Sequence, residues 1–170
     1  MKMMLLTRLY DTNAIYGYSF TNGKQYIAPL LSQDNYQMRL TMGITYELQN
    51  LIKQDFGSIE SIEFVRNIVV EKHQSGQFPR ERLLEHEELP TLRFLNSVLS
   101  TNNLSKNSRK NDLNFLDASL IIIAKRLKVD IVSTENRLNV LYIKGMLPEG
   151  VNIINPYPDG FEEIKNPLLS

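Results

Sequence analysis

The chain has 170 residues, enough for one domain with a continuous hydrophobic core. Its 19 basic residues balance its 19 acidic residues, which disfavours a protein that coats DNA with a basic face. Cysteine is absent, and this excludes disulfides, zinc–thiolate sites and cysteine nucleophiles.

The chain has no pattern typical of membrane insertion. No apolar stretch approaches the roughly 18 residues that a membrane-spanning helix needs. The apolar run near the N-terminus is too short for a secretory signal, because Arg8 and Asp11 interrupt it. We therefore expect a cytoplasmic protein without a membrane partner.

The first part of the chain predicts alternating strands and helices. Residues 4–10 are apolar and β-compatible, and this first strand ends at Asp11. A short helix is expected across 26–32. Residues 39–45 alternate apolar and polar side chains, which predicts a second strand, and 46–57 then change to helical spacing.

The central part of the chain reads as helical. Apolar side chains recur at helical spacing over 59–74, and two further helical stretches follow at 80–89 and 92–104. Pro90 lies between these two stretches, so a kink or a break is expected there.

The last part of the chain predicts two more strands. Residues 114–128 form the strongest helix signal, and this helix is apolar on all sides near its middle, so we expect it to be buried. Short strands are expected at 129–133 and 151–156, with a helix over 135–145 between them. Residues 157–170 look like a peripheral tail.

This order of elements predicts a three-layer α/β/α sandwich with a mostly parallel central sheet. We expect one domain over 1–170, with a helical insertion at about 58–104. Polar residues over 100–112 look like an exposed loop. Right-handed crossovers bring the carboxyl ends of the strands to one edge of the sheet, where ligand sites of open α/β sheets lie.

Four acidic residues are expected near this edge. Asp11, Glu47 and Glu135 fall at or just past the ends of predicted strands, and Asp117 falls in the first turn of the buried helix. Each acid alone also fits a structural role, as a helix cap or as a favourable charge near a helix N-terminus. Their coincidence at one predicted edge favours a shared site.

Three stretches of the sequence resemble the PIN-domain family, which includes toxins of the VapC type. LLTRLYDTNAIYG is similar to the opening strand of that family, with its Asp-x-Asn ending. GITYEL is similar to the family's second block, and FLDASLIIIAKRLKVDIVSTENRL resembles its third. The resemblance covers roughly residues 4–155.

The resemblance implies roles for individual residues. Asp11, Glu47 and Asp117 would be the metal-binding acids, and Glu135 would be the fourth, in a position where the family usually has Asp. Asn13 would orient the side chain of Asp11 without binding the metal itself.

Two polar residues next to Glu135 leave the alignment of that block open. Ser133 stands where the family usually has Thr, so it would be a supporting residue near the metal. A different register would place Thr134 and Asn136 in the roles of Ser133 and Glu135.

The function that the resemblance implies is hydrolysis of RNA by a Mg²⁺- or Mn²⁺-dependent ribonuclease. Hard divalent cations prefer carboxylate oxygens, and they activate water and neutralise phosphate charge. Single-stranded RNA or an RNA loop would be the substrate, and an antitoxin protein would be a partner. A homodimer through the apolar helices of 59–99 is also an expectation.

Other polar residues are weaker candidates. His73 and His86 have charged neighbours, so we expect them at the surface, and Asp112 is expected in a loop. Six basic residues around the buried helix are candidates for contacts with RNA phosphates: Lys106, Arg109, Lys110, Lys125, Arg126 and Lys128.

Competing functions make different demands on the sequence. A PIN-like fold can persist as an inactive binding or scaffold module whose acids serve as caps. A haloacid-type phosphatase needs a second Asp two residues after the first, and Asn13 occupies that position. Nucleotide binding through a glycine-rich loop is excluded, because neither usual motif is present.

Overall fold

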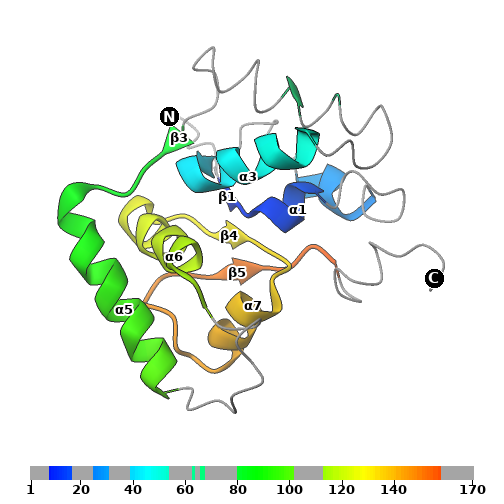
Figure 1. Ribbon diagram of the computed structural model, residues 1–170. Helices are drawn as coiled ribbons and strands as arrows, with labels where there is room; N and C mark the ends of the chain where they lie inside the picture. The colour runs from blue at the N-terminus through cyan, green and yellow to red at the C-terminus, as the bar shows by residue number, and fades with distance from the viewer. Residues whose placement is uncertain are drawn as a thin grey trace, which may run out of the picture.

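The computed structural model describes residues 8–16, 25–30, 39–53, 63, 66–67, 80–101 and 113–157 (Figure 1). Side chains of a few residues within these ranges are not described. The elements in chain order are β1 (Leu9–Tyr10), α1 (Thr12–Tyr16), β2 (Leu40–Thr41), α3 (Met42–Lys53), β3 (Arg80–Glu81), a 3-10 turn (Glu85–Glu87), α5 (Glu88–Thr101), α6 (Phe115–Leu127), β4 (Ile131–Val132), α7 (Asn136–Ile143) and β5 (Ile153–Ile154). Residues 25–30 are also helical.

All the described strand pairs are parallel. Strands β1, β4 and β5 form one sheet in that order, and β2 pairs with β3. An isolated parallel bridge between Leu9 and Arg39 connects the two pieces, so the strands follow the spatial order β3-β2-β1-β4-β5. The predicted α/β class with a mostly parallel sheet is confirmed.

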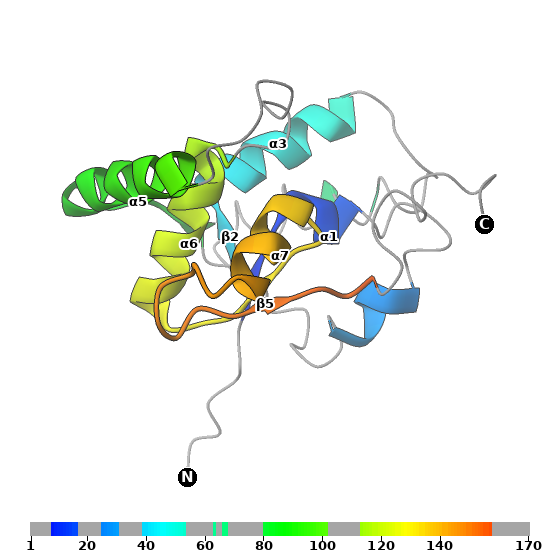
Figure 2. The same ribbon diagram turned by 90° about the horizontal axis from the view of Figure 1, so that it is seen from below.

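Helix α6 is the buried helix that the sequence predicts. The side chain of Asn114 caps its N-terminus by accepting a hydrogen bond from the backbone N–H of Asp117 at 2.9 Å. Lys128 ends the helix in a left-handed conformation, with φ of 56°. Helix α5 packs against α6, as both views of the ribbon show (Figures 1 and 2).

The prediction of a second strand over 39–45 was wrong beyond Thr41. Met42 already begins α3, because the hydroxyl of Thr41 accepts the backbone N–H of Ile44 at 3.2 Å and caps the helix. Gly43 in this first turn lies against Leu116 of α6. A Cβ at Gly43 would lie 2.1 Å from Cδ1 of Leu116, so the two helices approach closely here.

The predicted helix over 80–89 was also wrong. Arg80–Glu81 is a strand beside β2, and a 3-10 turn at Glu85–Glu87 leads into α5. Pro90 is the third residue of α5, where a missing N–H leaves no intrahelical bond unmade, so it neither kinks nor breaks the helix. Most of the predicted helix over 59–74 and most of the loop over 100–112 lie outside the described residues; residues 63, 66 and 67 are described and helical.

The C-terminal elements follow the prediction, and β5 leads back to the core. Helix α7 lies beside β5 (Figure 2). Tyr157, the first residue of the predicted tail, is fully buried, and its hydroxyl donates to the carbonyl of Ala14 at 2.9 Å. Residues 158–170 are not described. No helix in the described part is long and apolar enough to cross a membrane.

Candidate active site

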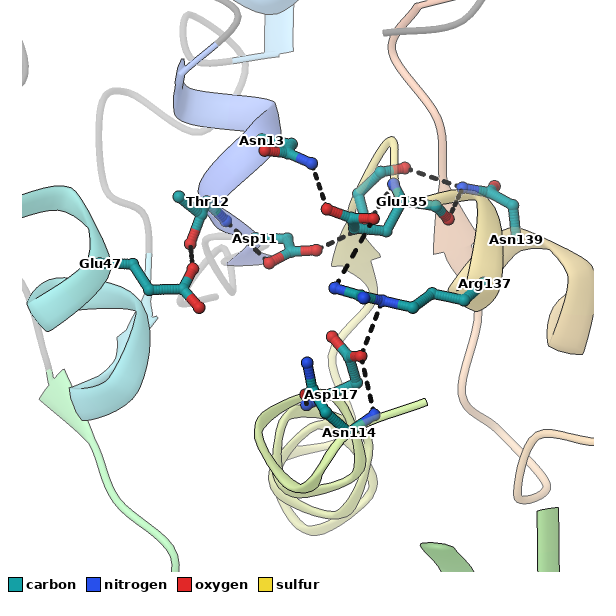
Figure 3. Close-up of polar contacts among 10 residues, drawn as sticks. Asp11, Thr12, Asn13, Glu47, Asn114, Asp117, Glu135, Arg137 and Asn139 are labelled. Carbon is teal, nitrogen blue, oxygen red and sulfur yellow. Dashed lines mark hydrogen bonds and ion pairs between the residues drawn. The ribbon is translucent and has the colours of Figure 1, made fainter. Parts of the chain in front are cut away.

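Four acidic side chains from distant parts of the chain gather beside the carboxyl ends of β1 and β4 (Figure 3). They are Asp11 after β1, Glu47 in α3, Asp117 in the first turn of α6 and Glu135 at the N-terminus of α7. The parallel topology explains why two of them share one edge, since β1 and β4 are neighbours with the same direction.

Asp11 is buried, as Asp117 is. Asp11 is 6% exposed, and both of its carboxylate oxygens accept hydrogen bonds. Oδ1 accepts from the backbone N–H of Thr12 at 2.8 Å, and Oδ2 accepts from the hydroxyl of Ser133 at 2.8 Å. The first of these contacts supports the start of α1, so Asp11 has a capping role as well as its place in the cluster.

Glu47 reaches the cluster from a different position than the sequence predicts. It is the sixth residue of α3, rather than a residue at the end of a strand. The hydroxyl of Thr12 donates to its Oε2, which links Glu47 to the segment that carries Asp11.

Asp117 connects α6 to α7. It is buried, and its helical neighbours Leu120, Ile121 and Ala124 are core residues, as the spacing predicts. Asp117 is not the N-cap of α6, which is Asn114; as the third helical residue it completes the cap, because its Oδ2 accepts the backbone N–H of Asn114 at 3.2 Å. The same Oδ2 lies 2.9 Å from Nε of Arg137, a residue of α7.

Glu135 is held by contacts from two segments. Asn13 donates from Nδ2 to its Oε1. The resemblance implied that Asn13 would orient Asp11, but the structure places it on Glu135 instead. The hydroxyl of Ser133 accepts the backbone N–H of Glu135 at 3.1 Å while donating to Asp11. Ser133 thus bridges the two acids.

The alternative register for this block does not fit the contacts that the structure describes. Thr134 is 8% exposed, and its hydroxyl has no hydrogen-bond partner among the described residues. The side chain of Asn136 is not described. Ser133, rather than Thr134, is the hydroxyl that reaches the cluster.

Burial and mutual repulsion make two of the carboxylates reluctant to ionise. Burial raises the pKa of the Asp11 carboxyl from 3.8 to about 7, the Ser133 hydrogen bond opposes this, and the charges of Asp117 and Glu135 add to it. Burial likewise raises the pKa of Asp117 from 3.8 to about 6, against the opposing effect of Arg137. A bound cation, or a proton on one of these carboxyls, would therefore reduce the repulsion among the acids.

The carboxylate oxygens of the cluster are suitable ligands for a hard divalent cation, but the acidic side chains lie too far apart in this structure to bind one ion together. Carboxylate oxygens are the ligands that Mg²⁺ and Mn²⁺ prefer. Among the described residues, no three acidic or histidine side chains lie close enough together to hold one ion. A guanidinium, that of Arg137, lies between Asp117 and Glu135 instead (Figure 3).

The predicted phosphate contacts receive little support from the described residues. Arg126 is paired with Glu87 at 3.1 Å and donates to the carbonyl of Arg82 at 2.9 Å, so its guanidinium is already engaged. Lys125 and Lys128 are exposed at the opposite end of α6 from Asp117. His86 is exposed, as predicted. The remaining candidates lie outside the described residues: His73, Lys106, Arg109, Lys110 and Asp112.

Three residues of the site were not predicted from the sequence. Thr12 holds Glu47, Arg137 pairs with two acids, and Asn139 donates to the carbonyls of Ser133 and Glu135 at 3.2 and 2.9 Å. Arg137 follows Glu135 by two positions in the sequence. This proximity could have indicated that Arg137 lies near the acidic cluster.

Comparisons with known proteins support the fold. No protein-family model and no curated protein matches this sequence. The crystal structure of FitAcB from Neisseria gonorrhoeae superposes with a TM-score of 0.56 at 14% identity, covering 90% of this chain and 99% of that one. A structure of FitAB bound to an IR36 DNA fragment gives a TM-score of 0.56 at 12% identity, covering 89% and 95%. These similarities support a PIN-like α/β fold.

Proposed function

We propose that this chain is a metal-dependent endoribonuclease that hydrolyses RNA phosphodiester bonds at the carboxylate cluster. The observation that carries the proposal is the convergence of Asp11, Glu47, Asp117 and Glu135 from four separate segments. Burial and the neighbouring acids raise the pKa of the Asp11 and Asp117 carboxyls, so a divalent cation would favour their ionised forms.

In the proposed reaction, Mg²⁺ or Mn²⁺ would supply a Lewis acid that activates a water molecule and neutralises charge on the phosphate. Asp11 and Asp117 would be its main ligands, with Glu47 and Glu135 completing the acidic site. Ser133 fixes the carboxylate of Asp11 through its hydrogen bond at 2.8 Å. Hydrolysis consumes one water and leaves a phosphate monoester and a free hydroxyl.

The role of Thr12 and Asn13 in this proposal is to orient carboxylates. The Thr12 hydroxyl donates to Glu47, and the Asn13 amide donates to Glu135. Both donors lie in the first turn of α1, directly after Asp11. One short segment thus contributes one acid and positions two others.

The test is cleavage of end-labelled single-stranded RNA with Mn²⁺, with and without a chelator. Asp117→Asn should lose metal-dependent cleavage. The matched control is Asp130→Asn, because Asp130 precedes β4 and so lies at the opposite edge of the sheet. Equal cleavage by the parent protein and Asp117→Asn would overturn the proposal.

The biological setting that we propose is a toxin paired with an antitoxin. The support is the fold similarity to structures described as FitAcB and FitAB, the second bound to DNA. Co-expression with the product of an adjacent short reading frame, followed by native mass spectrometry, tests the pairing. Inhibition of RNA cleavage by that product would support it, and free, unbound protein would contradict it.

A catalytically inactive PIN-like binding module is the second candidate. The observation that favours it is that Asp117 already has structural partners, the Asn114 backbone and Arg137. Calorimetric titration with Mn²⁺ separates the two functions. Absence of binding at millimolar metal would favour the inactive module.

A further inference from the structure

Arg137 occupies the middle of the carboxylate cluster. Its Nε lies 2.9 Å from Oδ2 of Asp117, and its terminal nitrogen lies 3.7 Å from Oε2 of Glu135. Figure 3 shows the guanidinium extending from α7 between the two acids. The side chain of Arg137 is 24% exposed, so solvent reaches part of it.

The contact between Arg137 and Asp117 is electrostatic rather than a well-aligned hydrogen bond. Nε is buried and close to Oδ2, yet it has no hydrogen-bond partner of acceptable geometry among the described residues. Hydrogen bonds weaken steeply when their angle is poor. The ion pair therefore lacks the directional component that would fix the guanidinium in place.

Asp117 has one oxygen free of these contacts. The described contacts of its carboxylate, from Asn114 and Arg137, both fall on Oδ2. A magnesium ion binds carboxylate oxygens at about 2.0–2.1 Å and demands near-octahedral geometry. A cation held by both Asp117 and Glu135 would need the space between them that the guanidinium occupies, and the two positive charges would repel each other.

From this geometry we infer that Arg137 is a built-in counter-ion of the site, and that a divalent cation binds only by displacing its guanidinium from Asp117. The inference rests on the proposed function, since it concerns the same metal. It explains how the charges of Asp117 and Glu135 are compensated within the chain itself. It also makes metal affinity depend on a residue that is not itself a ligand.

The first test is calorimetric titration of the parent protein and Arg137→Gln with Mn²⁺ alone. The titration is run near pH 8, since loss of Arg137 raises the pKa of Asp117 and protons would otherwise compete with metal. We expect Arg137→Gln to bind Mn²⁺ about tenfold more tightly, equivalent to about 1.4 kcal/mol.

The matched control is Arg126→Gln. Arg126 also pairs with a buried glutamate, Glu87, but it lies in the last turn of α6 while Asp117 lies in the first. Nine positions of helix separate them by about 13 Å. We expect the control to keep the Mn²⁺ affinity of the parent protein.

The outcomes separate this inference from the proposed function. Equal affinity of the parent protein and Arg137→Gln, or weaker binding by the variant, would overturn the inference and leave a metal site in place. Absence of Mn²⁺ binding in both proteins would overturn the inference and the proposed function together.

A second measurement follows metal binding in the parent chain and uses a variant only to assign one signal. The Nε–H signals of arginines labelled with ¹⁵N are followed by NMR as diamagnetic Mg²⁺ is added. The signal of Arg137 is assigned by its loss in Arg137→Lys. We expect this signal to move with Mg²⁺ while that of Arg126 stays in place. An unmoved Arg137 signal at saturating Mg²⁺ would overturn the inference.

Discussion

The Ser133 hydroxyl donates a hydrogen bond to Oδ2 of Asp11 over 2.8 Å, although 122 positions separate the two residues in the chain. Each residue directly follows a strand, and the two strands, β1 and β4, are parallel neighbours. The sheet register therefore places this pair. Because the same hydroxyl accepts the backbone N–H of Glu135, one side chain connects two acids.

Replacing Ser133 with Ala should raise the pKa of Asp11 further above its ordinary value. The Ser133 hydrogen bond is the strongest influence that lowers this pKa. The free energy of unfolding should fall by about 1 kcal/mol. Carboxyl ¹³C titration by NMR measures the pKa, and Ser133→Thr, which keeps the hydroxyl, is the control. An unchanged Asp11 titration in Ser133→Ala would contradict this account.

Asp11→Asn should change how stability depends on pH in the absence of metal. The folded-state pKa of Asp11 is raised from 3.8 to about 7, so the folded chain holds this proton more tightly than the unfolded chain. The parent protein therefore loses stability as pH rises from about 4 to about 7, by an amount on the order of a few kcal/mol.

Asn cannot ionise, so the variant lacks this loss and should match or exceed the stability of the parent protein at neutral pH. Its Oδ1 can still accept the backbone N–H of Thr12, as Asp11 does. Thermal unfolding of both proteins in chelator, across pH 4 to 8, measures the difference. Parallel stability curves for the two proteins would show that Asp11 does not titrate as stated.

Gly43→Ala should disturb the contact between α3 and α6. The added Cβ would meet Cδ1 of Leu116 at 2.1 Å, and overpacking of this kind costs about 1–3 kcal/mol. Ala favours a helical position by up to about 1 kcal/mol, which offsets part of the loss. We expect a net loss of about 1 kcal/mol in the free energy of unfolding.

Leu116→Ala removes the side chain that a Cβ at Gly43 would meet, and it tests whether this contact causes the loss of stability. In that background, Gly43→Ala should be neutral or stabilising, since only its helical preference remains. Urea unfolding of the two single variants and the double variant measures the coupling. Additive effects would mean that Leu116 moves aside freely.

Glu87→Gln should weaken the fold without affecting metal binding. Glu87 is buried, and its Oε2 accepts from Nε of Arg126, which joins the start of α5 to the end of α6. Its Oε1 accepts the backbone N–H of Leu84, a contact that Gln can keep. We expect a loss of about 1–3 kcal/mol by chemical denaturation, because the ion pair is lost. A change in Mn²⁺ affinity at a temperature where the variant is folded would contradict the separation of this pair from the site.

The helices and strands of the C-terminal part were predictable because their signals are local. The apolar middle of 114–128, the cap at Asn114 and the short apolar segments that became β4 and β5 all act over a few residues. The start of α3 was misjudged for the same kind of reason. Its first turn alternates like a strand, and the Thr41 cap decides the outcome.

The sequence by itself determined that Asp11 follows a strand, that Asp117 lies at the start of a buried helix and that Glu135 precedes α7, because strand ends and helix starts are encoded in neighbouring residues. It did not place Glu47, which lies within α3 rather than at a strand end. Only the tertiary structure decided how those acids are held: Thr12 on Glu47, Asn13 on Glu135 and Arg137 on Asp117. Such contacts depend on how α1, α3, α6 and α7 pack around the sheet. No local pattern specifies the distance between side chains that belong to different helices.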